Sequence, residues 1–178
     1  MQLLAQQIIN GLSLGGIYAL IALGYTMVYG IIELINFAHG DVYTLGSFIA
    51  LAILTALGVS GVVTGWPLVG VVAITLVGSM LLCGLAGVAI ERLAYRRLRN
   101  APRLAPLITA IGVSFVLENI MQLWRGPSPV FFPSVIPNVS WTVRGVVVQS
   151  NELLVIATAL VMTVSYTHLR AHETGRKL

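Results

Sequence analysis

The longest stretch without a formal charge runs from Val42 to Ile90, which is 49 residues. A helix needs about 20 apolar residues to cross the hydrocarbon of a bilayer, so this stretch has room for two crossings. Over the whole chain, charged residues make up only 9% and hydrophobic residues 57%, whereas roughly 25% of the residues in an average soluble domain are charged. We therefore expect a multi-pass membrane protein rather than a soluble one.

Five apolar segments are long enough, or nearly so, to be membrane helices. They are residues 8–29, 42–57, 68–90, 107–124 and a fifth segment that begins near Leu153. Pro67 fits the first turn of the third helix, where its missing amide hydrogen would have no helical partner anyway. The expected fold class is all-α, a polytopic transmembrane helical bundle of about five spans.

The basic residues are distributed unevenly. Residues 1–91 contain no Lys or Arg, and the first five arginines then follow within a short connector between the third and fourth spans. They are Arg92, Arg96, Arg97, Arg99 and Arg103. Short basic loops are retained on the cytoplasmic side during insertion, so we expect the connector, residues 91–106, to be cytoplasmic.

This orientation predicts the side of the other loops. Residues 125–150 should be external, and counting back through the spans places the polar segment from Glu33 to Asp41 near the inner face, with the N-terminus outside. A re-entrant first region would invert the side of the N-terminus. Within the external loop, residues 141–148 are typical of a short β-hairpin that turns at Arg144-Gly145.

The end of the chain differs in composition from the rest. After Val164 the residues become polar, which leaves the fifth span with about 12 apolar residues where about 20 are needed. We expect residues 1–164 to form a membrane domain that is cut short at its C-terminal side. Residues 165–178 resemble a translated sequencing adapter and are interpreted as a non-native tail; a genuine polar tail is the alternative.

Small residues recur at every fourth position of the first and third spans. Such rows lie on one helix face and let another helix approach closely. The rows are Gly11, Gly15, Ala19, then Ala22, Thr26, Gly30, and in the third span Ser79, Cys83, Gly87. We expect the first row to be a helix-packing face, although Gly and Ala are also common in membrane helices generally.

Polar groups interrupt the apolar sequence between Glu33 and Asp41, a segment that also contains Asn36 and His39. A charged group at the bilayer centre costs at least ~2.5 kcal/mol. The segment is therefore expected to be a bend or a break that reaches an interface, a polar cavity or partners within the protein. For Asp41 we favour a capping role at the start of a helix beginning at Val42.

A second polar group lies in the fourth span. Glu118, with Asn119 and Gln122, could line a polar path. The favoured alternative is a position at the outer interface, because these residues lie in the last two turns of that span.

The sequence offers no catalytic constellation. His39 and Asp41 are too few for a metal site, and no nucleophile, base and orienting group can be assigned. A glycine-rich phosphate-binding motif with Lys and Ser or Thr is absent, so we expect that this chain does not bind and split a nucleotide by that route, that it holds no cofactor, and that any energy source is elsewhere. The net charge of +4 is concentrated at loop positions, which does not indicate nucleic-acid binding.

Four segments of the chain form a recognisable set: NGLSLGGIYAL at residues 10–20, INFAHGD at 35–41, ERLAYR at 91–96 and RLAPLI at 103–108. Together they resemble the membrane permease of bacterial branched-chain amino-acid ABC transporters. The resemblance covers residues 1–164 and is closest to the branched-chain amino-acid type, while related members for urea or short amides share much of the Asn-x-Ala-His-Gly pattern. Members of this family are longer than this chain.

The resemblance implies a permease subunit of an ATP-driven importer in the bacterial inner membrane. It implies a second permease subunit, identical or related, two cytoplasmic ATPase subunits and a periplasmic substrate-binding protein that selects the cargo. Asn36, His39 and Asp41 are then candidates for a hinge beside the substrate path, with Glu118 as a further path candidate. The arginines of the connector are candidates for contact with the ATPase or with anionic lipid headgroups.

Two other functions stay open at this point. In an ion-coupled secondary transporter, Glu33, His39, Asp41 and Glu118 would carry or coordinate the ion. A membrane scaffold would show no dependence on cargo.

The resemblance also implies that the principal ATPase-contacting loop is in the part of the family sequence that lies beyond this chain.

Overall fold

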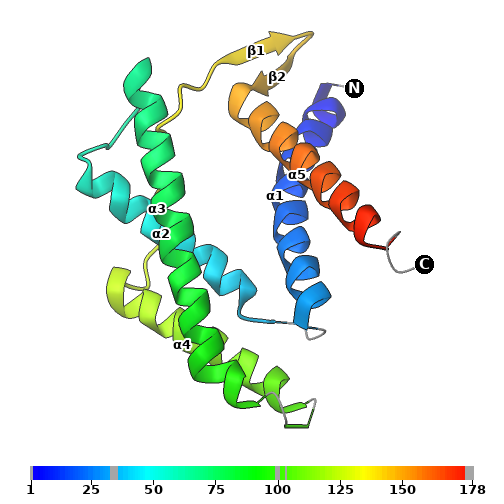
Figure 1. Cartoon of the computed structure of the whole chain (residues 1–178). Helices are drawn as coiled ribbons and strands as arrows, with labels where there is room; N and C mark the ends of the chain where they lie inside the picture. The colour runs from blue at the N-terminus through cyan, green and yellow to red at the C-terminus, as the bar shows by residue number, and fades with distance from the viewer. Residues whose placement is uncertain (1, 33–35, 99–100, 103, 175–178) are drawn as a thin grey trace. The chain divides into compact units, whose positions relative to one another are not determined.

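The computed structural model describes residues 2–32, 36–98, 101–102 and 104–174 (Figure 1). In this part of the chain, five helices are long and apolar enough to cross a membrane. The helices and strands are α1 (Gln2–Ile32), α2 (His39–Ala56), α3 (Trp66–Ile90), η1 (Glu91–Tyr95), η2 (Arg96–Leu98), α4 (Leu104–Arg125), β1 (Ser140–Val143), β2 (Val146–Gln149) and α5 (Ser150–Thr174). The all-α polytopic fold with a small hairpin is confirmed.

The chain divides into two compact units. One consists of residues 1–26 together with residues 138–178, and the other of residues 27–137. The first therefore contains most of α1, the hairpin and α5, and the second contains α2, α3, η1, η2 and α4.

In the second unit, α2 and α3 form an antiparallel pair joined by the turn at residues 57–65. Small residues keep the two helices close. A Cβ atom built on Gly46 of α2 would lie 3.1 Å from the Sγ atom of Cys83, and one built on Gly78 of α3 would lie 2.8 Å from Cδ1 of Ile53. Of the row predicted in the third span, Cys83 lies at this interface. A Cβ atom built on Gly87 would meet no atom within 4 Å.

The core of the second unit lies where the chain enters α2 and crosses α4. Ala38, Leu117 and Met121 are its buried residues, and Ala38 is 0% exposed. Partly buried hydrophobic residues surround them, namely Val42, Leu45, Phe48, Ile90 and Val113. At the end of α4, the ring of Trp124 lies 6.5 Å from that of Phe48, between centroids. This packing fixes the start of α2 against α4.

Two hydrogen bonds mark the opposite ends of the second unit. The Tyr95 hydroxyl donates to Asn36 at 2.8 Å, which joins the end of the α3 region to the start of α2. The Val63 amide donates to the Val135 carbonyl at 2.9 Å, which joins the α2–α3 turn to the segment after α4. The first arginines and the α2–α3 turn therefore lie at different ends of the unit. The counting of spans predicts this separation, because one span lies between these two connecting segments.

In the first unit, the hairpin packs on the start of α1. β1 and β2 are antiparallel, with Ser140 opposite Gln149 and Val143 opposite Val146. The turn lies at Arg144 and Gly145, whose φ values are 52° and 81°; positive φ at both central residues is what a type I′ hairpin turn requires. The predicted hairpin and its turn are confirmed.

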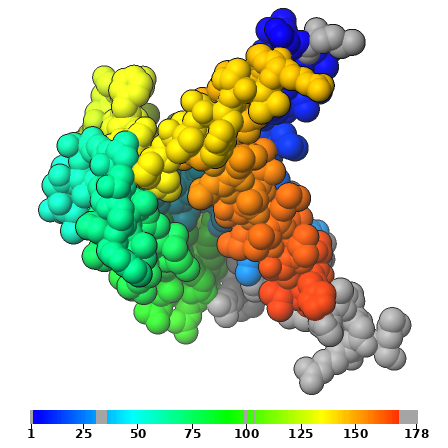
Figure 2. Space-filling model, turned by 90° about the horizontal axis from the view of Figure 1, so that it is seen from above, coloured from blue at the N-terminus to red at the C-terminus, as the bar shows by residue number. Residues whose placement is uncertain are grey.

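Side chains of α1 complete the edge of the hairpin. Gln6 donates to the Val147 carbonyl at 2.9 Å and accepts from the Val147 amide at 2.8 Å, and Gln2 donates to the Arg144 carbonyl at 3.1 Å. Figure 2 shows the hairpin, in yellow and orange, beside the dark-blue start of α1. Farther along α1, Gly16 packs against Val155 and Ala159 of α5.

The α-helix α3 ends at Ile90, as predicted for the third span. The first part of the predicted basic connector is itself helical, because η1 and η2 continue the helical path from Glu91 to Leu98. Charged side chains do not end a helix, and long arginines can extend from it into water. The fifth helix continues past Val164 to Thr174, and residues 150–169 qualify as a candidate span. The interpretation of residues 165–178 as a non-native tail stays a prediction.

Candidate functional site

The candidate site is the break between α1 and α2, of which residues 36–38 are described and are not helical. Asn36 organises this break. Its side-chain oxygen accepts hydrogen bonds from the Ala38 amide at 3.1 Å and from the Tyr95 hydroxyl at 2.8 Å, and its carbonyl accepts from the His39 amide at 3.1 Å. An Asn side chain that bonds the amide two residues on stabilises a turn and competes with the helix.

Asp41 is not the cap that we favoured. The helix begins at His39 and not at Val42, so Ala38 and not Asp41 occupies the capping position. No side chain makes a capping hydrogen bond there. Asp41 instead lies in the first turn of α2, where the positive end of the helix dipole stabilises a negative charge. Its carboxylate accepts a hydrogen bond from the Ser114 hydroxyl of α4. The capping prediction failed because Asn36 starts the turn before Asp41 is reached.

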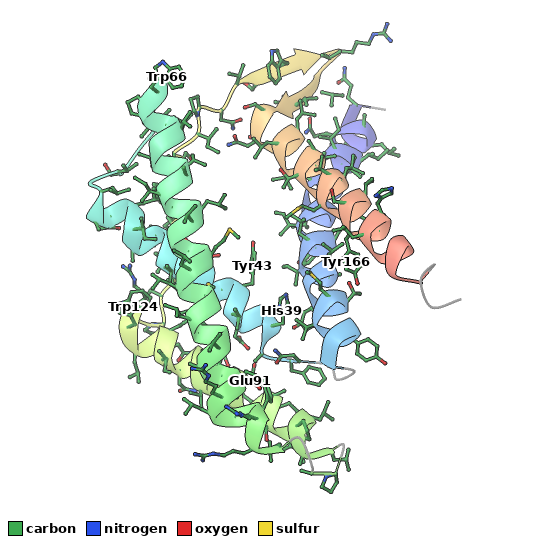
Figure 3. All side chains as sticks on the ribbon, viewed as in Figure 1. His39, Tyr43, Trp66, Glu91, Trp124 and Tyr166 are labelled. Carbon is green, nitrogen blue, oxygen red and sulfur yellow. The ribbon has the colours of Figure 1, made fainter. Side chains whose placement is uncertain are left out.

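His39 is the first residue of α2 and is half-buried (Figure 3). The structure thus brings Asn36, His39 and Asp41 together at the start of one helix. Their role as a hinge stays a prediction. Glu33, which the ion-coupled alternative requires, lies outside the described residues.

Glu118 is not part of this cluster. It is exposed on α4 next to the buried Leu117, and the neighbouring Asn119 side chain bonds the Phe115 carbonyl of its own helix. Its role in a polar path stays a prediction.

The arginines predicted as loop contacts lie on a helical segment. We call residues 91–98, which comprise η1 and η2, the helical extension. Within it Arg92, Arg96 and Arg97 are exposed, whereas Tyr95 is half-buried. The extension opens with a turn of π-helix, in which the Arg96 amide bonds the Glu91 carbonyl five residues back. Arg99 and Arg103 lie outside the described residues.

The predicted packing row of α1 is exposed among the residues that the structure describes. Gly11, Gly15 and Ala19 are exposed, and a Cβ atom on either glycine would meet nothing within 4 Å. Gly16, one position along, makes the contact with α5 instead. The use of the row as a packing face therefore stays a prediction about contacts outside this unit.

Ser114 and Tyr95 are the site residues that the sequence analysis missed. Ser114 gave no signal, because serine is common in membrane helices. Tyr95 gave a weak one, since a tyrosine at a helix end within the ERLAYR segment has an apolar ring and a hydroxyl that seeks a partner. Among the described residues, no group of three or more His, Cys, Asp or Glu side chains is placed to hold a metal ion.

Comparison with known proteins decides between the classes of membrane protein. The family described as "branched-chain amino acid transport system / permease component" matches residues 7–178. The chain belongs to this family. The five candidate spans among the described residues agree with a multi-pass protein of the inner membrane.

Curated relatives are similar along nearly the whole chain. The high-affinity branched-chain amino acid transport system permease protein LivH of Escherichia coli is 43% identical over 177 residues, which cover 96% of this chain and 56% of that protein. LivH of Salmonella typhimurium is 42% identical with the same coverage.

The permease protein BraD of Pseudomonas aeruginosa is 43% identical over 162 residues, which cover 88% of this chain and 52% of BraD. The chain therefore spans about half the length of the curated relatives it matches. No solved structure shows a significant match.

Proposed function

We propose that this chain provides part of the transmembrane pathway of an ATP-driven importer for branched-chain amino acids. The observation that carries the proposal is the family match over residues 7–178. It is supported by relatives named as high-affinity branched-chain amino acid permeases at 42% and 43% identity. The same match favours this function over an ion-coupled secondary transporter.

The proposed assembly contains a second permease subunit, cytoplasmic ATPase subunits and an external substrate-binding protein. The open row of Gly11, Gly15 and Ala19 suits close packing against another helix of such an assembly. The exposed Arg92, Arg96 and Arg97 suit a cytoplasmic contact with an ATPase or with anionic headgroups. ATP-driven closure of the ATPase pair would then shift the permease between inward-open and outward-open states.

The break before α2 is the proposed hinge beside the substrate path. Asn36 accepts a hydrogen bond from the Tyr95 hydroxyl, and Asp41 accepts one from the Ser114 hydroxyl of α4. A mainly apolar passage suits leucine, isoleucine and valine, whose side chains need no hydrogen-bond partner. Related small amides are the alternative cargo.

Reconstituted transport tests this proposal. A full-length permease carrying this sequence, assembled in liposomes with its ATPase and binding protein, should take up leucine only when ATP is inside and the binding protein is outside. An ATPase variant that binds ATP without hydrolysing it should abolish uptake.

The same liposomes test the ion-coupled alternative. Ionophores that collapse proton and sodium gradients should leave ATP-driven uptake unchanged. Uptake by the permease alone, driven by an imposed ion gradient, would establish the alternative and reject the proposal.

A further inference from the structure

The helical extension has two different faces. Arg92, Arg96 and Arg97 are exposed on it, while Tyr95 of the same short segment turns inward and is half-buried. The extension follows α3 without a gap through one π-helical turn. Such turns are rare and occur frequently at functional sites, because the wider turn shifts the side chains that follow it around the helix axis.

The inward contact of Tyr95 reaches the break before α2. Its hydroxyl donates at 2.8 Å to the side-chain oxygen of Asn36, the same oxygen that accepts the Ala38 amide. One atom therefore joins the extension to the first turn of α2. The next residue of that turn, His39, is bonded to the Asn36 carbonyl.

The start of α2 cannot move alone. Ala38 is fully buried against Leu117 and Met121 of α4, and Asp41 accepts the hydroxyl of Ser114 on the same helix. Closely packed interiors move as units rather than deform continuously. A displacement of the extension either carries this packed group with it or breaks the bond between Tyr95 and Asn36.

We infer that Tyr95 is a positioning residue that couples the arginine-bearing helical extension to the hinge before α2. The inference rests on the proposed function and deepens it. The ATPase contacts the exposed arginines, and the Tyr95–Asn36 hydrogen bond transmits the resulting displacement to α2 and α4. Tyr95 touches neither the substrate nor ATP.

The test measures leucine imported per ATP hydrolysed in the reconstituted full-length transporter. Tyr95→Phe removes only the hydroxyl and keeps the ring in its packing. The ratio should fall about five-fold, the effect of losing about one net hydrogen bond from the coupling between two sites. ATP hydrolysis itself should continue, which separates lost coupling from misfolding.

Tyr43→Phe is the matched control, because Tyr43 lies on α2 with its side chain 51% exposed (Figure 3). This variant should keep the wild-type ratio. Asn36→Ala should lower the ratio at least as far as Tyr95→Phe, because it removes the bond to the Ala38 amide as well as the bond to Tyr95. The double variant should fall no further than Asn36→Ala alone, because the Tyr95–Asn36 bond is already lost in that variant.

Three results would overturn the inference. They are a wild-type ratio in Tyr95→Phe, an equal loss in Tyr43→Phe, and a double variant that shows the product of the two single losses. Absence of ATP-driven uptake in the wild type would instead reject the proposed function, and with it the inference that rests on it.

Discussion

At the scale of single residues, Asp41 and Ser114 show how a carboxylate is accommodated in a membrane helix. The Ser114 hydroxyl of α4 donates to the Asp41 carboxylate in the first turn of α2. Charged groups in membrane segments are costly unless they are partnered. This bond therefore ties α2 to α4 at the place where the chain has just re-entered a helix.

Removing the hydroxyl should destabilise the protein. In Ser114→Ala the carboxylate loses a donor, and leaving a partly buried polar group unsatisfied costs about 1–3 kcal/mol. Thermal unfolding in detergent should show a lower midpoint. Ser47→Ala is the control, since the exposed Ser47 hydroxyl donates to the Tyr43 carbonyl of its own helix. Equal midpoints for the two variants would contradict the assigned role of Ser114.

Single residues also show where prediction from sequence ends. Asn36 was identified because an amide is unusual within an apolar segment, and the structure gives it three hydrogen-bonding roles. Its partner Tyr95 is 59 positions away in the sequence, and Ser114 is 73 positions from Asp41. Periodicity and composition carry no information on such pairings, which depend on how the helices cross.

At the scale of elements, the hairpin depends on α1 for part of its hydrogen bonding. Two strands alone are marginally stable in water, and here Gln6 accepts from the amide and donates to the carbonyl of Val147. The glutamine thus acts as a short extension of the sheet edge. Docking on α1 therefore holds the hairpin in place.

Gln6→Leu should release the hairpin. Because two hydrogen bonds of about 1 kcal/mol net each are lost, hydrogen exchange at the Val147 amide should speed up by roughly ten-fold or more. Gln7→Leu, at the next and exposed position of the same helix, should leave the exchange rate unchanged. Unchanged protection in Gln6→Leu would show that the hairpin is held by other contacts.

The elements themselves were largely predictable, because membrane helices follow from apolar length alone. Pro67 lies in the first turn of α3 as expected, two residues after Gly65, whose φ is 72°. The helical extension was missed because clustered arginines were taken to mark a loop. Continuous helix from Trp66 to Leu98 has 33 residues and a length of about 50 Å, so one end projects beyond a hydrocarbon layer of about 30 Å.

At the scale of the whole molecule, two ends of the second unit are defined by contacts rather than by charge. Tyr95 meets Asn36 at one end, and Val63 meets Val135 at the other. Hydropathy alone predicted the number of spans, and therefore which connecting segments lie at the same end of the unit. The side of the membrane on which each end lies follows from the arginines alone, because lipid insertion and not internal packing decides it.

The proposed coupling to an ATPase requires the arginine-bearing end to face the cytoplasm. Thiol labelling in spheroplasts tests this directly, with Cys83, the free cysteine of the chain, first replaced by alanine. An impermeant maleimide should label a cysteine introduced by Val62→Cys in the α2–α3 turn, where Val62 is 57% exposed. It should label Arg97→Cys only after the membrane is permeabilised. Labelling of Arg97→Cys in intact spheroplasts would contradict the account.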